Sequence, residues 1–199
     1  MRYSLVLTAL VSALLWLSGC ATIPKDYVRP EESYASVPVQ SGILADTAHR
    51  IEAKYGPDLS GFHLLDSNPS ALRWRLALID EATSSLDIQT YLWYSDFSGR
   101  LVLVRTLEAA NRGVRVRLIV DDLLMIGKDK SLRALDNHPN IDIRLFNPWK
   151  KRPLFGRVTE SVMEMERLNY RMHDKLMVVD NQAVILGGRN LGDHYVGLS

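Results

Sequence analysis

The chain has 199 residues, with 24 basic and 23 acidic side chains and a formal net charge of +1. A charge so close to zero excludes a protein that binds polyanions over its whole surface, so any basic site must be local. The length suits one domain with its own core, and 47% apolar residues are typical of a globular protein.

The first twenty residues have the pattern of a secretory signal that ends in a lipid attachment site. Arg2 precedes an apolar run over residues 5–17, which is shorter than the roughly 20 residues of a membrane span. Small residues then lead to Cys20, the only cysteine, in a sequence similar to a bacterial lipobox. We expect residues 1–20 to be a lipoprotein signal with lipidation at Cys20; the alternative is a plain signal peptide with an incidental cysteine.

A lipid anchor would hold the protein in the bacterial cell envelope, facing the periplasm, with each buried methylene contributing about 0.8 kcal/mol. Ala21 follows the cysteine where an inner-membrane retention signal would place aspartate, which favours the outer membrane. Residues 21–40 are polar and interrupted by prolines, as in a flexible tether. The folded domain is therefore expected at residues 41–199.

Helical and strand patterns alternate through this domain. Apolar spacing and capping residues predict helices at residues 43–54, 69–83, 99–112 and 128–137, and strands at 62–65, 85–94, 114–120 and 141–146. The order predicts an α/β fold, an α-β-α sandwich around a mostly parallel or mixed sheet, with ligands beyond the carboxyl ends of the strands. A final apolar hairpin, residues 175–180 and 183–186, is expected near the centre of the sheet.

Residues 147–170 have no clean period. Basic side chains such as Lys150 and Lys151 are mixed there with the aromatic residues Trp149 and Phe155. Two interpretations stay open: a solvated connection, or a loop that steers an anionic head group or nucleic acid.

The final hairpin carries the residues with the clearest chemistry. His173 and Lys175 are two apart and share a face of an extended strand, so a nucleophilic imidazole lies beside a cation. This pairing suits attack on a phosphate ester, with a phosphohistidine intermediate and with Lys175 stabilising the transition-state charge. Gly187, Gly188 and Asn190 follow as phosphate ligands through backbone N–H groups and a side-chain amide. The scheme needs no cofactor and no metal ion.

Asp180 is set apart by strand parity. It lies five residues after Lys175, on the opposite face of an unbulged strand, so we expect it to orient or end the hairpin. A direct role would require a bulge near residues 178–179. Gln89, Tyr91 and Asp121, on or at the end of predicted strands, are candidates to line the site behind the phosphate ligands.

The run HDKLMVVD, followed six residues later by Gly187-Gly188-Arg189-Asn190, resembles the phospholipase D superfamily motif His-x-Lys-x4-Asp-x6-Gly-[Gly/Ser/Thr]-x-Asn. Upstream, LDIQTYLWYSDFSGRLVLVRTLEAANRGVRVRLIVDD and DNHPNIDIRLFNP resemble the bacterial cardiolipin synthase branch, most of all its C-type members. The resemblance covers roughly residues 71–199. It implies phosphatidyl transfer between phospholipids at a membrane surface, with His173, Lys175 and Asp180 as the catalytic motif and with His173 as either the nucleophile or its partner acid.

Members of this branch carry two such motifs, whose histidines share one active site as nucleophile and acid. This chain has one, so the resemblance implies half of a site that a C-terminal half or a second subunit completes. Three functions stay open. They are a phosphatidyltransferase of the cardiolipin synthase type, a hydrolytic phosphodiesterase (a phospholipase D or a single-motif dimeric nuclease acting on nucleic acid), and an inactive truncated fragment that binds lipid.

Overall fold

The structure is a computed structural model and describes residues 31–198. It divides into two units. The sheet unit comprises Glu32–Phe146 and Arg171–Ser199, and the described part of the other unit is Glu31 and Asn147–Tyr170. The predicted signal, Cys20 and the tether up to residue 30 lie outside the described residues and stay predictions.

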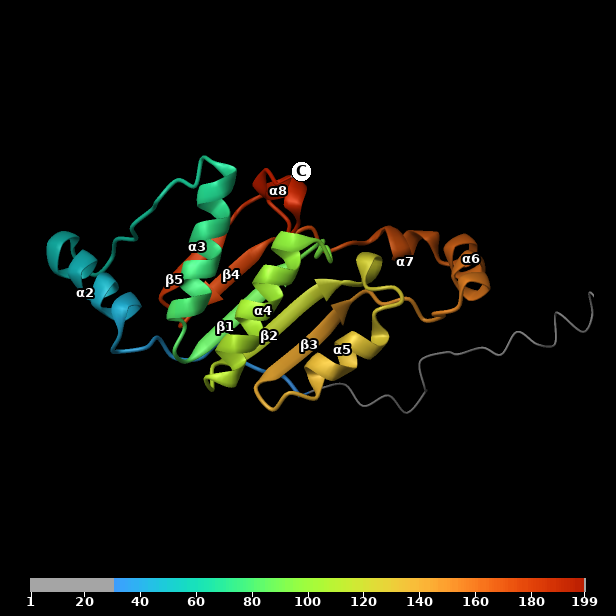
Figure 1. Ribbon diagram of the computed structural model, residues 1–199, viewed down its shortest axis with the longest axis horizontal. Helices are drawn as coiled ribbons and strands as arrows, with labels where there is room; N and C mark the ends of the chain where they lie inside the picture. The colour runs from blue at the N-terminus through green and yellow to red at the C-terminus, as the bar shows by residue number, and fades with distance from the viewer. Residues whose placement is uncertain (1–30, 199) are drawn as a thin grey trace, which may run out of the picture. The chain divides into compact units, whose positions relative to one another are not determined.

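Five strands form one mixed sheet in the order β3-β2-β1-β4-β5 (Figure 1). The strands are β1 (Ser85–Thr90), β2 (Arg115–Asp121), β3 (Ile141–Phe146), β4 (Leu176–Val179) and β5 (Ala183–Leu186). β1, β2 and β3 pair in parallel, whereas β4 is antiparallel to both β1 and β5. The predicted α/β fold with a mixed sheet is confirmed. The hairpin is only partly central, because β5 lies at the edge and exposes Val184 and Leu186.

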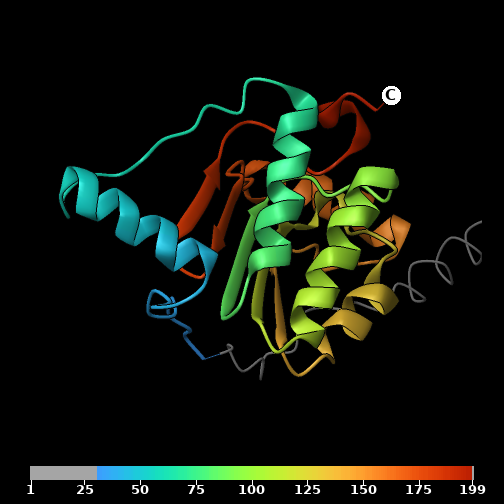
Figure 2. The same ribbon diagram turned by 60° about the vertical axis from the view of Figure 1, so that its left-hand side comes forward.

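Helices α3, α4 and α5 lie over one face of the sheet (Figure 2). The helices of the sheet unit are α2 (Ile43–Tyr55), α3 (Asn68–Glu81), α4 (Phe97–Asn111), α5 (Asp129–Asp136) and α8 (Asp193–Val196), with a 3-10 turn, η1 (Asp122–Leu124). Capping explains two of the starts, because the Ser67 hydroxyl accepts from the Ser70 N–H and the Asp96 carboxylate from the Gly99 N–H. The strand predicted at residues 62–65 is wrong, since these residues form no strand.

The core lies between this helical layer and the sheet. Every second strand residue faces it, including Leu86, Ile88, Val116, Leu118, Val120, Met177 and Val179. The intervening residues face the other way, where Arg117 and Asp87 form an ion pair on neighbouring strands. The period of two that predicted the strands therefore also separates the buried face from the polar face.

The described end of the predicted tether is docked on the sheet unit. The Arg117 guanidinium donates to the Ser33 carbonyl at 3.1 Å, and the Gln182 amide donates to the Val39 carbonyl at 2.8 Å. Residues 33–39 are thus held by side chains from distant parts of the chain. A polar, proline-containing sequence gives no sign of such contacts.

Residues 147–170 form two short helices instead of an irregular loop. They are α6 (Leu154–Met163) and α7 (Met165–Asn169). The Asn147 side-chain amide closes this unit by donating to the carbonyls of Arg167 and Tyr170, both at 2.7 Å.

Asp180 fastens the hairpin to the beginning of β1. Its carboxylate accepts from the N–H groups of Thr83, Ser84 and Ser85 at 2.7–3.2 Å and from the Thr83 hydroxyl at 2.8 Å. Burial raises the pKa of Asp180, but these hydrogen bonds to the charged carboxylate outweigh it, so the pKa lies below its ordinary value. The ionised carboxylate is therefore part of the fold.

We expect Asp180→Asn to lower the free energy of unfolding by about 1.5–3 kcal/mol at pH 7, because buried N–H donors lose a charged acceptor. A lowered folded-state pKa means that the stabilisation is present above the unfolded-state pKa and is lost as the pH falls through the folded-state pKa. Urea unfolding at pH 7 and pH 3 should therefore show a smaller difference from wild type at pH 3. Asp58→Asn, in an exposed turn, is the control and should show no difference; an equal loss at both pH values for Asp180→Asn would contradict the assignment.

Candidate functional site

The His-x-Lys pair lies at the carboxyl end of β1, where Gln89 pairs with Leu176 at the start of β4. Lys175 is 8% exposed, and its Nζ donates to the His173 carbonyl at 2.6 Å and lies 3.5 Å from His173 Nδ1. The His173 side chain is exposed. The site thus joins an accessible imidazole to a buried ammonium group.

Tyr91 packs beside both His173 and Lys175. Its ring centroid lies 4.8 Å from that of His173 and 5.4 Å from Lys175 Nζ. The aromatic face partly replaces the solvation of the ammonium group. Burial nevertheless lowers the pKa of Lys175, and the charge of Asp174 raises it by less. A desolvated cation of this kind is suited to bind an anion.

Asn190 is oriented by the segment that follows β1. Its Oδ1 accepts from the Leu92 N–H at 3.2 Å, and within the described residues its Nδ2 makes no hydrogen bond. The next residue continues the pairing: Leu191 N–H donates to the Leu92 carbonyl at 3.1 Å, and Tyr94 N–H donates to the Leu191 carbonyl at 2.8 Å. Gly192 permits the approach, because a Cβ there would lie 2.7 Å from the Tyr94 ring. The side-chain amide is therefore fixed with its donor unused.

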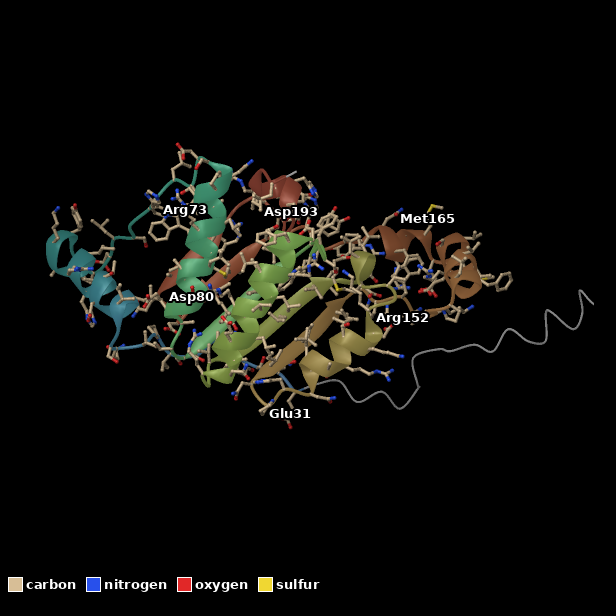
Figure 3. The ribbon with its side chains drawn as sticks, in the orientation of Figure 1. Glu31, Arg73, Asp80, Arg152, Met165 and Asp193 are labelled. Atoms are coloured by element: carbon tan, nitrogen blue, oxygen red, sulfur yellow. The ribbon has the colours of Figure 1, made fainter. Side chains whose placement is uncertain are left out.

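The α8 turn reinforces this docking. Asp193, labelled in Figure 3, accepts from the Ser98 N–H at 2.7 Å and donates its own N–H to the Asp96 carboxylate at 2.8 Å. The predicted phosphate ligands Gly187 and Gly188 precede Asn190 and are exposed, and a Cβ at either would meet no heavy atom within 4 Å. Packing does not demand glycine there, and the backbone is open to a ligand.

Asp180 does not join this cluster. Its carboxylate contacts Thr83, Ser84 and Ser85, next to the opposite end of β1 from Lys175. Asp180 therefore makes a structural contact on the side that strand parity favours, away from Lys175, and its role in the catalytic motif stays a prediction.

The other candidates lie close to the pair. Gln89 lines the same small cavity as Lys175, and its amide lies 3.5 Å from the Asp174 carboxylate. Asp121 is fully buried and accepts from Arg171 Nη1 at 3.1 Å and from the Met172 N–H at 3.3 Å. It therefore holds the two residues that precede His173 and acts on the site through them.

Two arginines of the site were not predicted from the sequence. Arg75 of α3 and Arg189 line the cavity beside Lys175. Arg75 is buried and donates to the Ala71 carbonyl at 2.9 Å, and no carboxylate of the described residues pairs with it. Burial lowers the pKa of Arg75, and the charge of Arg189 lowers it further. The sequence pattern that could have indicated Arg75 is its spacing, because it falls on the apolar face of its helix, four residues before Ile79.

Within residues 31–198, no three His, Cys, Asp or Glu side chains lie together as a metal-binding group. His194 packs against the rings of Tyr94 and Tyr195, with centroid distances of 4.9 and 4.1 Å. In the same part of the chain, no helix has the length and apolar character to cross a bilayer.

Comparison with known proteins places this chain in a family. Residues 76–198 match the family described as cardiolipin synthase, PLD-like domain. The chain is 45% identical over 141 residues to cardiolipin synthase C of Escherichia coli, a match that covers 71% of this chain and 29% of that protein. It is 32% identical over 128 residues to the major cardiolipin synthase ClsA of Bacillus subtilis, a match that covers 62% of this chain and 24% of that protein. The chain thus spans less than a third of the length of these relatives.

Among solved structures, NucT from Helicobacter pylori is similar with a TM-score of 0.47 and 21% identity, covering 68% of this chain and 76% of that one. Nuc from Salmonella typhimurium, described as a phospholipase D family member, is similar with a TM-score of 0.43 and 23% identity, covering 65% and 70%.

We expect Lys175→Met to raise stability at neutral pH, because it removes a buried charge and keeps the side-chain volume. The pKa of Lys175 is lower in the folded protein than in the unfolded chain. Between these two pKa values the unfolded chain binds more protons, so the stability of the wild type increases as the pH rises from the folded-state pKa to the unfolded-state pKa. The advantage of the variant should therefore shrink between pH 7 and pH 10 in thermal unfolding. Lys130→Met, at an exposed position of α5, should show no such trend; a constant difference for Lys175→Met would contradict the burial argument.

We expect Arg75→Met to weaken the binding of inorganic phosphate by about tenfold, since it removes a buried positive charge beside Lys175. Titration calorimetry on the purified protein measures this affinity. Arg73→Met changes an exposed arginine of the same helix (Figure 3) and should leave phosphate affinity unchanged. Equal effects of the two substitutions would show that the cavity beside Lys175 is not the anion site.

Proposed function

Because the chain belongs to the cardiolipin synthase family of PLD-like domains, we propose that it transfers a phosphatidyl group from one phospholipid to the hydroxyl of another. The observation that carries the proposal is the exposed His173 imidazole beside buried Lys175 and the unused amide donor of Asn190. These are a nucleophile and two phosphate ligands, the groups that a metal-free attack on a phosphodiester needs.

In the first step, a neutral imidazole nitrogen of His173 attacks phosphorus. A nitrogen–phosphorus bond forms, the bond from phosphorus to one alcohol oxygen breaks, and that oxygen takes a proton from an acid. Negative charge on the non-bridging oxygens is stabilised by Lys175 and the Asn190 amide. Arg75 and Arg189 add positive charge behind Lys175.

In the second step, the hydroxyl of an acceptor lipid attacks the phosphohistidine. The nitrogen–phosphorus bond breaks, His173 is released as the neutral imidazole, and the hydroxyl proton passes to the base that served as the acid. Water in place of the lipid gives hydrolysis, the reaction of the alternative phosphodiesterase. A DNA phosphodiester in the site gives the nuclease alternative.

The acid of this scheme is proposed to come from outside the described chain. Its source is a second His-x-Lys motif, either in a C-terminal half or in a second copy. The short span of this chain relative to its relatives supports the first source. The proposed substrates lie in a membrane, and a lipid anchor at Cys20 would keep the site at its surface.

We expect His173→Asn to abolish both product formation and the covalent intermediate, while His49→Asn, an exposed histidine of α2, retains full activity. The assay incubates the purified protein with vesicles of phosphatidylethanolamine and phosphatidylglycerol radiolabelled at phosphorus, and separately with plasmid DNA. Brief reaction followed by alkaline denaturation should retain label on wild type, because phosphohistidine is lost in acid.

Cardiolipin as product supports transfer, phosphatidic acid supports hydrolysis, and nicked plasmid supports the nuclease alternative. Activity per molecule that rises with protein concentration would indicate a site shared between two copies. Activity that survives in His173→Asn would refute the nucleophile, and a wild type without any of the three products would support the inactive fragment.

A further inference from the structure

Helix α6 has its apolar side turned to the solvent. Leu154, Phe155, Val158 and Val162 are 71%, 66%, 56% and 76% exposed. At about 100° per residue, these four positions fall within an arc of roughly 100° on the helix. The stripe that would normally face a core is thus the accessible one.

The opposite side of α6 is charged and buried within its own unit. The Glu160 carboxylate accepts from the backbone N–H groups of Lys150 and Lys151, both at 3.0 Å, and pairs with Arg167. Gly156 lies on the same side, and a Cβ there would lie 2.7 Å from the Lys151 side chain. Rotating the helix to bury its apolar stripe would break these contacts and bury charge without partners. The outward stripe is therefore fixed by the unit itself.

The surroundings of the stripe are basic. Residues 147–170 hold five basic and three acidic side chains, and two of the acids, Glu160 and Glu164, are ion-paired within the unit. Lys151, just before α6, and Arg157, in its amino-terminal half, are partly exposed. With two more basic than acidic side chains, residues 147–170 carry a net positive charge.

Two further apolar side chains are exposed at the end of α6 and the start of α7. Met163 and Met165 are 83% and 61% exposed, and Figure 3 labels Met165 and Arg152 in this unit. Ten residues are too few to cross a bilayer, which takes about 20. An apolar stripe with cations beside it matches the boundary of a bilayer, where negative head groups lie over hydrocarbon.

We propose that residues 150–165 are an interfacial membrane-binding surface. α6 lies in the plane of an anionic bilayer, with Leu154, Phe155, Val158 and Val162 among the acyl chains and the basic residues at the phosphates. This surface is distinct from the His173 site, and its binding does not depend on the proposed reaction.

The test places a fluorescent probe on the stripe. Cys20 is the only cysteine, so Cys20→Ser gives a cysteine-free full chain in which Leu154→Cys takes a single environment-sensitive dye. With vesicles of equal parts phosphatidylglycerol and phosphatidylcholine, the emission should shift to the blue and be quenched by brominated acyl chains. The matched control is the same dye at Val104→Cys, on α4, where the native valine is 51% exposed; it should neither shift nor be quenched.

The same dye fluorescence measures the affinity of the protein for vesicles. Val158→Ser and Val162→Ser, added to the labelled protein, should each weaken vesicle binding more than tenfold. The reason is that each substitution removes an apolar side chain that would be buried among the acyl chains. Both positions are exposed, so the fold is not at risk, and Val104→Ser should have no effect. Binding should also fall at least tenfold when sodium chloride rises from 0.05 to 0.5 M or when phosphatidylglycerol is omitted.

Three outcomes would overturn the proposal. One is a dye at residue 154 that vesicles leave unchanged. Another is a shift without vesicles that grows with protein concentration, which assigns the stripe to a second copy. The third is an introduced cysteine that resists labelling while the control position reacts, which assigns the stripe to another part of the protein. Loss of catalytic activity has no part in the readout, so failure of the proposed reaction would leave this test unaffected.

Discussion

The carboxylate of Asp180 is the contact on which the geometry of the site depends. It binds three consecutive N–H groups at the entrance to β1 and so fastens the β4–β5 hairpin to the central strand. β4 is antiparallel to β1, so fixing one end of the pair sets the register at the other, where Gln89 meets Leu176. At about 3.3 Å per residue, the anchor acts on Lys175 from more than 10 Å away. An aspartate of the motif can therefore position the His173–Lys175 pair without contacting it.

At the other end of β1, positive charges lie close together at buried positions, where desolvation makes a charge unfavourable. Lys175 and Arg75 are both buried, and Arg75 faces the like charge of Arg189. Such an arrangement destabilises a fold, unless an anion enters. Perturbed groups that share a cavity are a physical sign of a ligand site. These local charges make the proposed phosphate site compatible with an overall net charge near zero.

The sequence was sufficient for the alternating helices and strands, because these follow from local periodicity. His173 and Lys175 lie just before β4, so their proximity does not rest on a shared strand face. The sequence was insufficient where the outcome depended on distant partners. An apolar run such as residues 183–186 is compatible with both a central strand and an edge strand. The docking of residues 33–39 depends on side chains that are distant in the sequence. α6 was missed because Gly156 and Glu160 interrupt its apolar pattern, and only the contacts of Glu160 show which side faces inward.

The exposure of His173 has a consequence for the proposed transfer. A phosphohistidine formed on an accessible imidazole would meet water far more often than an acceptor lipid, so an open site of this kind favours hydrolysis. Transfer requires a cover that excludes water while admitting a second lipid. The second motif would then have two tasks, to supply the acid and to close the site over His173. In the proposed scheme, the fit of that cover would decide between transfer and hydrolysis, since the roles proposed for His173, Lys175 and Asn190 are the same in both reactions.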